Sequence, residues 1–216
     1  MKRLVPVLAV LAALTATPAV HAAAKPAKTG ESEPAAVDSL KLLERQVARD
    51  SSRFDLVYRL GVMYLDREDM LNAATTLMRA NKLRPKDVKV LVNLGVALDA
   101  LGKPEDAQGY YHQALDVAPG DSVATCRLAS SMYAQGKYGP SIDMLRGLIQ
   151  AKPKSYCAYF TLGVAFADAG IYRDAINMWR KVIELAPQSP EAQSAKESID
   201  VLEKFLNAPA TPGAAK

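Results

Sequence analysis

The stretch VKVLVNLGVALDALGKPEDAQGYYHQALDVAPGD, residues 88–121, decides the fold because its landmarks recur along the chain every 34 residues. The two clearest columns are Leu60, Leu94, Leu128 and Leu162, and Pro85, Pro119, Pro153 and Pro187. A fixed period of this length is the signature of a repeat architecture, in which each unit buries its apolar face against the next. The sequence therefore predicts four copies, at 54–87, 88–121, 122–155 and 156–189.

Small and large residues alternate inside each copy. The small columns are Gly61, Gly95, Ala129, Gly163 and Ala73, Ala107, Ser141, Ala175. The large columns are Tyr64, Leu98, Met132, Phe166 and Leu77, Tyr111, Leu145, Trp179. Gly102, Gly136 and Gly170 stand between them, where a helix can end on a left-handed residue that glycine adopts at low cost. Each copy therefore reads as helix, turn, helix and a loop that ends at proline.

This pattern of Leu-Gly, aromatic, Ala, aromatic, Ala and Pro columns resembles the tetratricopeptide repeat family. The resemblance covers residues 54–189 and implies an all-α, right-handed solenoid of four helix-turn-helix units. Solenoid ends expose a flank that a neighbour would otherwise cover, so capping helices are expected. We place them at 37–53 and at 190–207, where Ser189 caps the helix and Pro190 occupies its first turn.

Two copies depart from the pattern. The first has Glu68 where the others have the turn glycine, and the third has Gly139 and Gly147 inside its second helix. A glycine within a helix costs about 1 kcal/mol relative to alanine. We therefore expect the third copy to be the least stable.

The first 22 residues are typical of a secretory signal peptide. Lys2 and Arg3 precede an apolar run over residues 4–16, and Val20-His21-Ala22 is a small-residue cleavage site. We expect cleavage after Ala22 and export, most simply to the periplasm. An uncleaved anchor is the alternative, but a membrane span needs about 20 apolar residues, more than this run supplies.

The segments that flank the repeats have a different composition. Residues 23–36 and 208–216 hold no large apolar residue, so both are expected to be flexible. No cysteine lies near residue 22, so the sequence does not predict a lipoprotein, and it predicts no integral span once the signal is removed.

Charge and residue types argue against nucleic-acid binding and catalysis. Removing Lys2 and Arg3 from the 27 Lys and Arg leaves 25 against 23 Asp and Glu, too even for a phosphate-binding surface. His112 is the single histidine after the signal, and no glycine-rich phosphate loop occurs. We therefore expect no enzyme activity, no cofactor and no metal site.

Cys126 and Cys157 are the only cysteines. An even number in an oxidising compartment favours a disulfide. Packed helix axes lie about 8–10 Å apart, however, whereas a disulfide needs Cα atoms within about 7 Å. The sequence leaves open either a bridge or two buried thiols.

The resemblance implies that the first helix of each copy lines a concave groove. The candidate partner-binding residues are Tyr58, Val62, Val92, Asn93, Val96, Arg127, Ser130, Tyr133, Phe160 and Val164. Apolar and aromatic side chains with a few polar groups are the mixture enriched at protein-binding surfaces. We expect an envelope scaffold that binds a protein or peptide in the groove, anchored by Tyr58, Tyr133 and Phe160.

Two further functions stay open. As exported relatives in this family sometimes are, the chain could be a client-specific chaperone or an assembly factor for cytochrome maturation, a pilus or a secretion machine. Self-association is also open, because solenoid ends and apolar grooves can accept a second copy.

Overall fold

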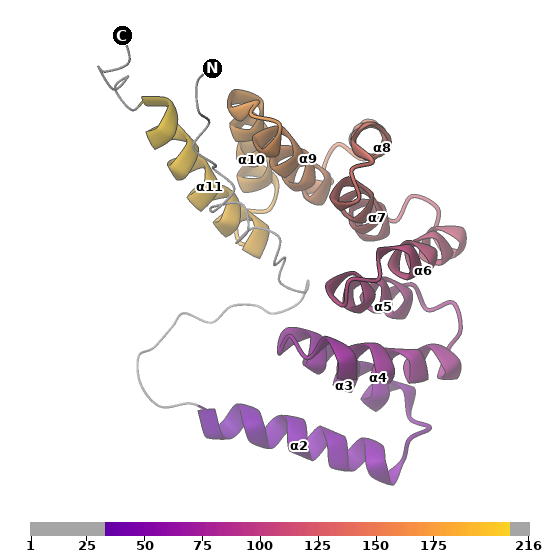
Figure 1. Ribbon diagram of the computed structural model, residues 1–216. Helices are drawn as coiled ribbons and strands as arrows, with labels where there is room; N and C mark the ends of the chain where they lie inside the picture. Colours follow the sequence, from indigo (N-terminus) through magenta and orange to yellow (C-terminus); the bar gives the residue numbers. More distant parts are fainter. Residues whose placement is uncertain (1–32, 208–216) are drawn as a thin grey trace, which may run out of the picture. The chain divides into compact units, whose positions relative to one another are not determined.

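The computed structural model describes residues 33–207, and this part of the chain consists of ten α-helices with no strand (Figure 1). The helices are α2 (Glu33–Arg49), α3 (Phe54–Asp66), α4 (Met70–Leu83), α5 (Val88–Ala100), α6 (Pro104–Val117), α7 (Ser122–Ala134), α8 (Tyr138–Ala151), α9 (Tyr156–Asp168), α10 (Tyr172–Leu185) and α11 (Pro190–Asn207). The expectation of an all-α helical repeat is confirmed. The predicted signal at 1–22, the linker up to residue 32 and the tail at 208–216 lie outside the described residues.

The chain divides into two compact units, residues 1–141 and 142–216. In the first unit, each helix from α2 to α7 packs against the next along the chain, as the ribbon of Figure 1 shows. The first helices of successive repeats also touch, α3 with α5 and α5 with α7. In the second unit, α9 packs on α10, and α11 packs on both of them.

Helix α2 covers the apolar flank of the first repeat. Its Leu43 and Val47 are buried in one cluster with Val57, Leu60 and residues of α4 and α5. It begins at Glu33 rather than at residue 37, so residues 33–36, expected in the linker, are helical. It ends at Arg49, and residues 50–53, expected in the helix, form the connection to α3.

Helix α11 covers the last repeat in the same way. Ala192, Ala195 and Leu202 are buried against Trp179 and Val182 of α10. The helix starts at Pro190, and the Ser189 hydroxyl accepts a hydrogen bond from the Ala192 backbone N–H at 3.1 Å. This N-cap satisfies a backbone donor that would otherwise lack a partner.

Aspartates start the first helices of repeats two and three. The Asp87 carboxylate accepts from the backbone N–H groups of Lys89 and Val90 at 3.0 and 3.2 Å, and Asp121 accepts from that of Ala124 at 2.8 Å. A carboxylate at a helix N-terminus also complements the helix dipole. Asp87 and Asp121 are 34 residues apart, so the period that places the core residues also places the starts of these two helices.

Left-handed residues separate the two helices of each repeat. Gly102, Gly136 and Gly170 have φ of 71°, 78° and 76°, which confirms the predicted turn. In the first repeat Glu68 adopts the same conformation with φ 59°. An L-residue with a side chain is strained there, because its Cβ crowds the backbone.

None of the helices in residues 33–207 is long and apolar enough to cross a membrane.

Candidate functional site

The first helices of the first unit bring seven of the predicted groove residues onto neighbouring elements. Because α3 contacts α5 and α5 contacts α7, these residues belong to one row of helices. We call them the first-helix surface: Tyr58 and Val62 on α3, Asn93 and Val96 on α5, and Arg127, Ser130 and Tyr133 on α7. Ser130 is exposed and the other six are half-buried, so each retains some contact with solvent.

Tyr58 and Asn93 form a fixed polar pair on this surface. The Asn93 Nδ2 group donates a hydrogen bond to the Tyr58 hydroxyl at 3.0 Å and so links α3 to α5. Burial and the nearby Asp87 charge raise the pKa of Tyr58, and the hydrogen bond from Asn93 opposes this shift. Tyr58 is therefore a neutral phenol over the physiological pH range, with an O–H group available as a donor.

Phe54 packs on the Tyr58 ring, and Arg84 packs on Phe54 in turn. Phe54 lies one helical turn before Tyr58 and stacks on it, with ring centroids 5.9 Å apart and planes 4° from parallel. The Arg84 guanidinium carbon sits 4.0 Å above the centroid of Phe54, a cation–π geometry. Sequence reasoning missed Phe54 and Arg84, which together order the aromatic end of the surface.

Asp99 on α5 is a second residue that sequence reasoning missed. Its carboxylate accepts from the Tyr111 hydroxyl and from the Ser131 hydroxyl, each at 2.8 Å. Burial raises the pKa of Asp99, and the two hydrogen bonds and the Arg127 charge oppose that rise. Asp99 lies one 34-residue period before Tyr133, which was a predicted groove residue. Comparing the repeats column by column could therefore have drawn attention to Asp99.

A chain of amides extends this network from α6 to α7. The Gln108 Nε2 group donates to the Ser131 hydroxyl at 3.1 Å and to Gln135 Oε1 at 2.9 Å, and the Gln135 amide donates to Glu105. Buried polar networks with their partners in place fix the arrangement of the elements they join. Helix α7, which carries Arg127 and Tyr133, is thus tied to the second repeat by polar contacts as well as by packing.

Two predicted groove residues are buried. Val92 is 6% exposed and Phe160 is 8% exposed, so neither presents much side chain to a partner. In the second unit Phe160 belongs to the core around Trp179, and Val164 packs against that core. The expectation that Phe160 anchors a partner is corrected by this burial. Val92, Cys126 and Phe160 occupy one column of the repeat and are all buried.

Neither cysteine is a free thiol in the described part of the chain. Cys126 and Cys157 are both disulfide-bonded. Their pairing with each other stays a prediction.

The arrangement on the first-helix surface suits recognition. Two tyrosines and two valines offer apolar area, and Asn93, Arg127 and Ser130 add polar groups to it. Among the residues that the structure describes, no group of three His, Cys, Asp or Glu side chains is placed to hold a metal ion. His112 lies on α6 and is exposed.

Comparison with protein families identifies the repeats. Tetratricopeptide repeat models match residues 88–121 and residues 158–189. The chain contains tetratricopeptide repeats. It is similar to human "DnaJ homolog subfamily C member 3", with 28% identity over 113 residues, and to the rat protein of that name, with 27%. The match covers 52% of this chain and only 22% of the length of either relative.

Solved structures share the tetratricopeptide repeat fold. "TTC0263: a thermophilic TPR protein", from Thermus thermophilus, has a TM-score of 0.65 and 16% identity, and the match covers 76% of this chain and 90% of that one. "MamA 41-end from Desulfovibrio magneticus RS-1" has a TM-score of 0.58 and 18% identity, with coverage of 73% and 89%. "YrrB: a TPR protein with an unusual peptide-binding site" has a TM-score of 0.52 and 21% identity, with coverage of 76% and 84%. Identities this low show the fold alone.

Proposed function

We propose that this tetratricopeptide repeat protein is a non-catalytic scaffold of the cell envelope that binds a partner protein on its first-helix surface. The observation that carries the proposal is the Tyr58–Asn93 hydrogen bond, which fixes two expected contact residues before any partner arrives. Ordering them in advance lowers the entropy lost on binding. The general role as a protein-interaction module follows from the repeat family.

The chemistry of the surface indicates the kind of segment it would bind. Val62 and Val96 lie at the same position of successive repeats, and Tyr58 on α3 and Tyr133 on α7 are half-buried aromatic residues. Aromatic anchors surrounded by small contacts are typical of binding hot spots. A helix or extended peptide with apolar side chains fits this set. The likeness to YrrB, which is described as having a peptide-binding site, supports a peptide-like partner.

The envelope location rests on the N-terminal sequence. Lys2 and Arg3, the apolar run and Val20-His21-Ala22 form the pattern of a cleaved export signal. N-terminal sequencing of the protein from a cell-envelope fraction is expected to begin at Ala23. Recovery of the chain from the cytosol with Met1 intact would contradict this part of the proposal.

Affinity capture with matched variants tests the binding surface. Tyr58→Ala with Tyr133→Ala is expected to abolish capture of partners from an envelope extract, because both aromatic anchors are removed. Tyr110→Ala on α6 serves as the control, since it removes a half-buried tyrosine outside the surface. Circular dichroism verifies that each variant remains helical. Equal capture by the wild type and the double variant would refute the assignment of this surface.

A further inference from the structure

Helix α4 carries an exposed stripe that its packing in the repeat does not require. Leu71, Thr75, Met78 and Lys82 follow one another at spacings of four, three and four, so they lie on one side of the helix. All four are exposed, Leu71 by 68% and Met78 by 44%. The opposite side, with Ala73, Leu77 and Ala80, is buried. Two large apolar side chains therefore face solvent from a helix whose core side is already filled.

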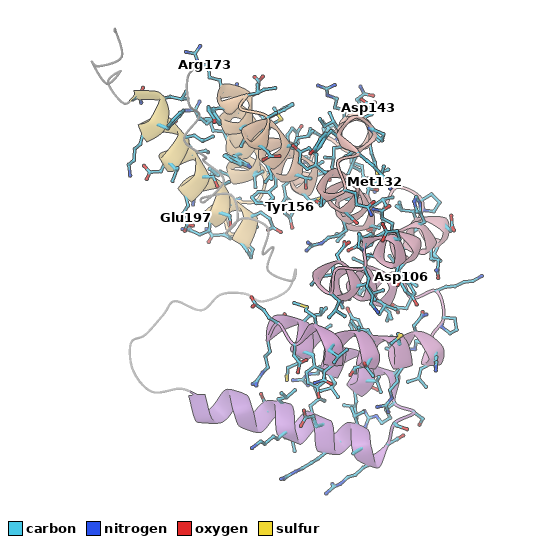
Figure 2. The ribbon with its side chains drawn as sticks, in the orientation of Figure 1. Asp106, Met132, Asp143, Tyr156, Arg173 and Glu197 are labelled. Atoms are coloured by element: carbon cyan, nitrogen blue, oxygen red, sulfur yellow. The ribbon has the colours of Figure 1, made fainter. Side chains whose placement is uncertain are left out.

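The other three repeats show what this stripe ordinarily contains. The equivalent positions of the other repeats, one period apart, are also exposed. They are Glu105, Gly109, His112 and Asp116 on α6; Gly139, Asp143, Arg146 and Gln150 on α8; and Arg173, Asn177, Arg180 and Glu184 on α10. Each of these sets includes a carboxylate, and none includes a large apolar side chain. Asp143 and Arg173 are labelled in Figure 2 on α8 and α10. The repeat fold therefore does not require apolar residues at these positions. The first repeat is the exception, because it has Leu71 and Met78 there.

Cations are frequent on α4 and in the segment that follows it. Arg79, Lys82, Arg84, Lys86 and Lys89 are all exposed, and no Asp or Glu occurs from Met70 to Lys86. The acids that border this stretch are engaged as helix caps: Asp69 accepts from the Asn72 backbone and Asp87 from the Lys89 and Val90 backbones. Their charges are therefore directed at helix N-termini. The exposed face of α4 combines the apolar Leu71 and Met78 with the cations Arg79 and Lys82, and the helix contains no Asp or Glu.

We propose that this face of α4, defined by Leu71, Met78, Arg79 and Lys82, docks on a membrane surface that contains anionic phospholipid. The Lys and Arg side chains bind lipid phosphates, and Leu71 and Met78 enter the boundary between headgroups and acyl chains. Amphipathic helices with cationic flanks bind membranes in this manner.

A lipid surface fits better than a folded protein partner or the chain's own tails. Leu71 and Met78 lie on the same side of α4 with Thr75 between them, and a lipid surface accepts such residues without a complementary pocket. Residues 23–32 and 208–216 hold no large apolar residue, and they contain three Lys against one acidic residue, Glu31. Neither segment complements an apolar, cationic face.

Docking through α4 leaves the partner surface on α3, α5 and α7 free. The buried side of α4 packs against α3 and α5, so the stripe faces away from both. The inference does not depend on the proposed function, because its residues and its ligand are different. A membrane-docked scaffold could present its first-helix surface to partners at the bilayer.

Vesicle co-sedimentation tests the proposal. The protein is purified as cells process it, so that wild type and variants have the same N-terminus, and is mixed with phosphatidylcholine vesicles with or without phosphatidylglycerol. The first variant is Leu71→Ser with Met78→Ser, and the second is Arg79→Glu with Lys82→Glu. All four positions are exposed, so the variants are expected to keep the wild-type helicity. The matched controls are Val201→Ser on α11 and Arg173→Glu with Lys196→Glu, also at exposed positions.

The wild type is expected to sediment with the phosphatidylglycerol vesicles at low salt and to be released at high salt. Each α4 variant is expected to lose affinity by at least about tenfold, and the controls by less than about twofold. Absence of wild-type binding would overturn the proposal. So would α4 variants that bind as well as the wild type, since another part of the chain would then account for the binding.

Discussion

The ring of Tyr111 occupies the space that a side chain on Gly95 would need. A Cβ at Gly95 would lie 2.8 Å from Cδ1 of Tyr111, closer than carbon atoms pack. The first repeat shows the same relationship, since a Cβ at Gly61 would lie 2.7 Å from Cγ of Leu77. Glycine in the first helix therefore lets a large residue of the second helix approach the backbone.

Gly95→Ala is expected to lower the free energy of unfolding by about 1–2 kcal/mol, because overpacking outweighs the gain in helix propensity. The matched control is Gly109→Ala on α6, where a Cβ would meet nothing within 4 Å. That change is expected to raise the free energy of unfolding by about 0.5–1 kcal/mol. Urea denaturation followed by circular dichroism measures both, and effects of the same sign would contradict the packing account.

The period in the sequence was sufficient to predict the repeat core. Leu60, Leu94, Leu128 and Leu162 recur at one interval and are all buried. Helix ends were harder, because α2 lies before the first full copy and has no equivalent column to define its start. It begins at Glu33 rather than residue 37. Composition alone predicted that residues 33–36 belong to a linker, but these residues form the start of α2.

Glu68→Gly is expected to stabilise the first repeat by about 0.5–1 kcal/mol. Glu68 has φ 59°, and relief of the strain of a left-handed L-residue exceeds the added entropy of glycine in the unfolded chain. Gly102→Ala at the equivalent turn, with φ 71°, should have the opposite effect. Thermal unfolding of the three proteins measures both changes. A lower melting temperature for Glu68→Gly would show that its side chain contributes more than the strain costs.

Stability at alkaline pH is expected to depend on Tyr64. Burial and the hydrogen bond from its hydroxyl to Glu44 raise the pKa of Tyr64 to about 12. Because the folded pKa lies above the unfolded value near 10, the stabilisation is complete below about pH 10. It is lost as the pH rises through about 12, where the phenolate would face the Glu44 carboxylate.

The phenolate difference spectrum between the wild type and Tyr64→Phe follows this titration. Glu44→Gln is expected to move the midpoint downward, because the carboxylate no longer opposes ionisation. A Tyr64 midpoint near 10 in the folded wild type would contradict the shift.

Cys126 and Cys157 are expected to form one disulfide with each other. Closing a loop of this length stabilises a chain by about 3–4 kcal/mol in the loop-entropy account. Peptide mapping without reductant should recover a single cross-linked pair, and reduction should lower the melting temperature. Two unlinked peptides from the non-reduced protein would refute the pairing.

The candidate surface was only partly predictable from the sequence. Tyr58, Asn93 and Tyr133 are half-buried on the expected helices, but Phe160 is in the core of the second unit. The 34-residue period could not predict this difference in burial. Tyr58 and Phe160 occupy the same column of the repeat, but different side chains pack around them. The hydrogen bonds of Asp99 were also not predicted, since they depend on side chains from α6 and α7.

Site-specific photo-cross-linking tests the central claim most directly. A photoreactive phenylalanine analogue replaces Val62 or Val96 on the first-helix surface, or His112 on the exposed side of α6 as the control. If the first-helix surface binds the partner, the same adduct forms from positions 62 and 96 and is absent from position 112. Adducts from position 112 alone, or equal adducts from all three positions, would contradict the assignment of this surface.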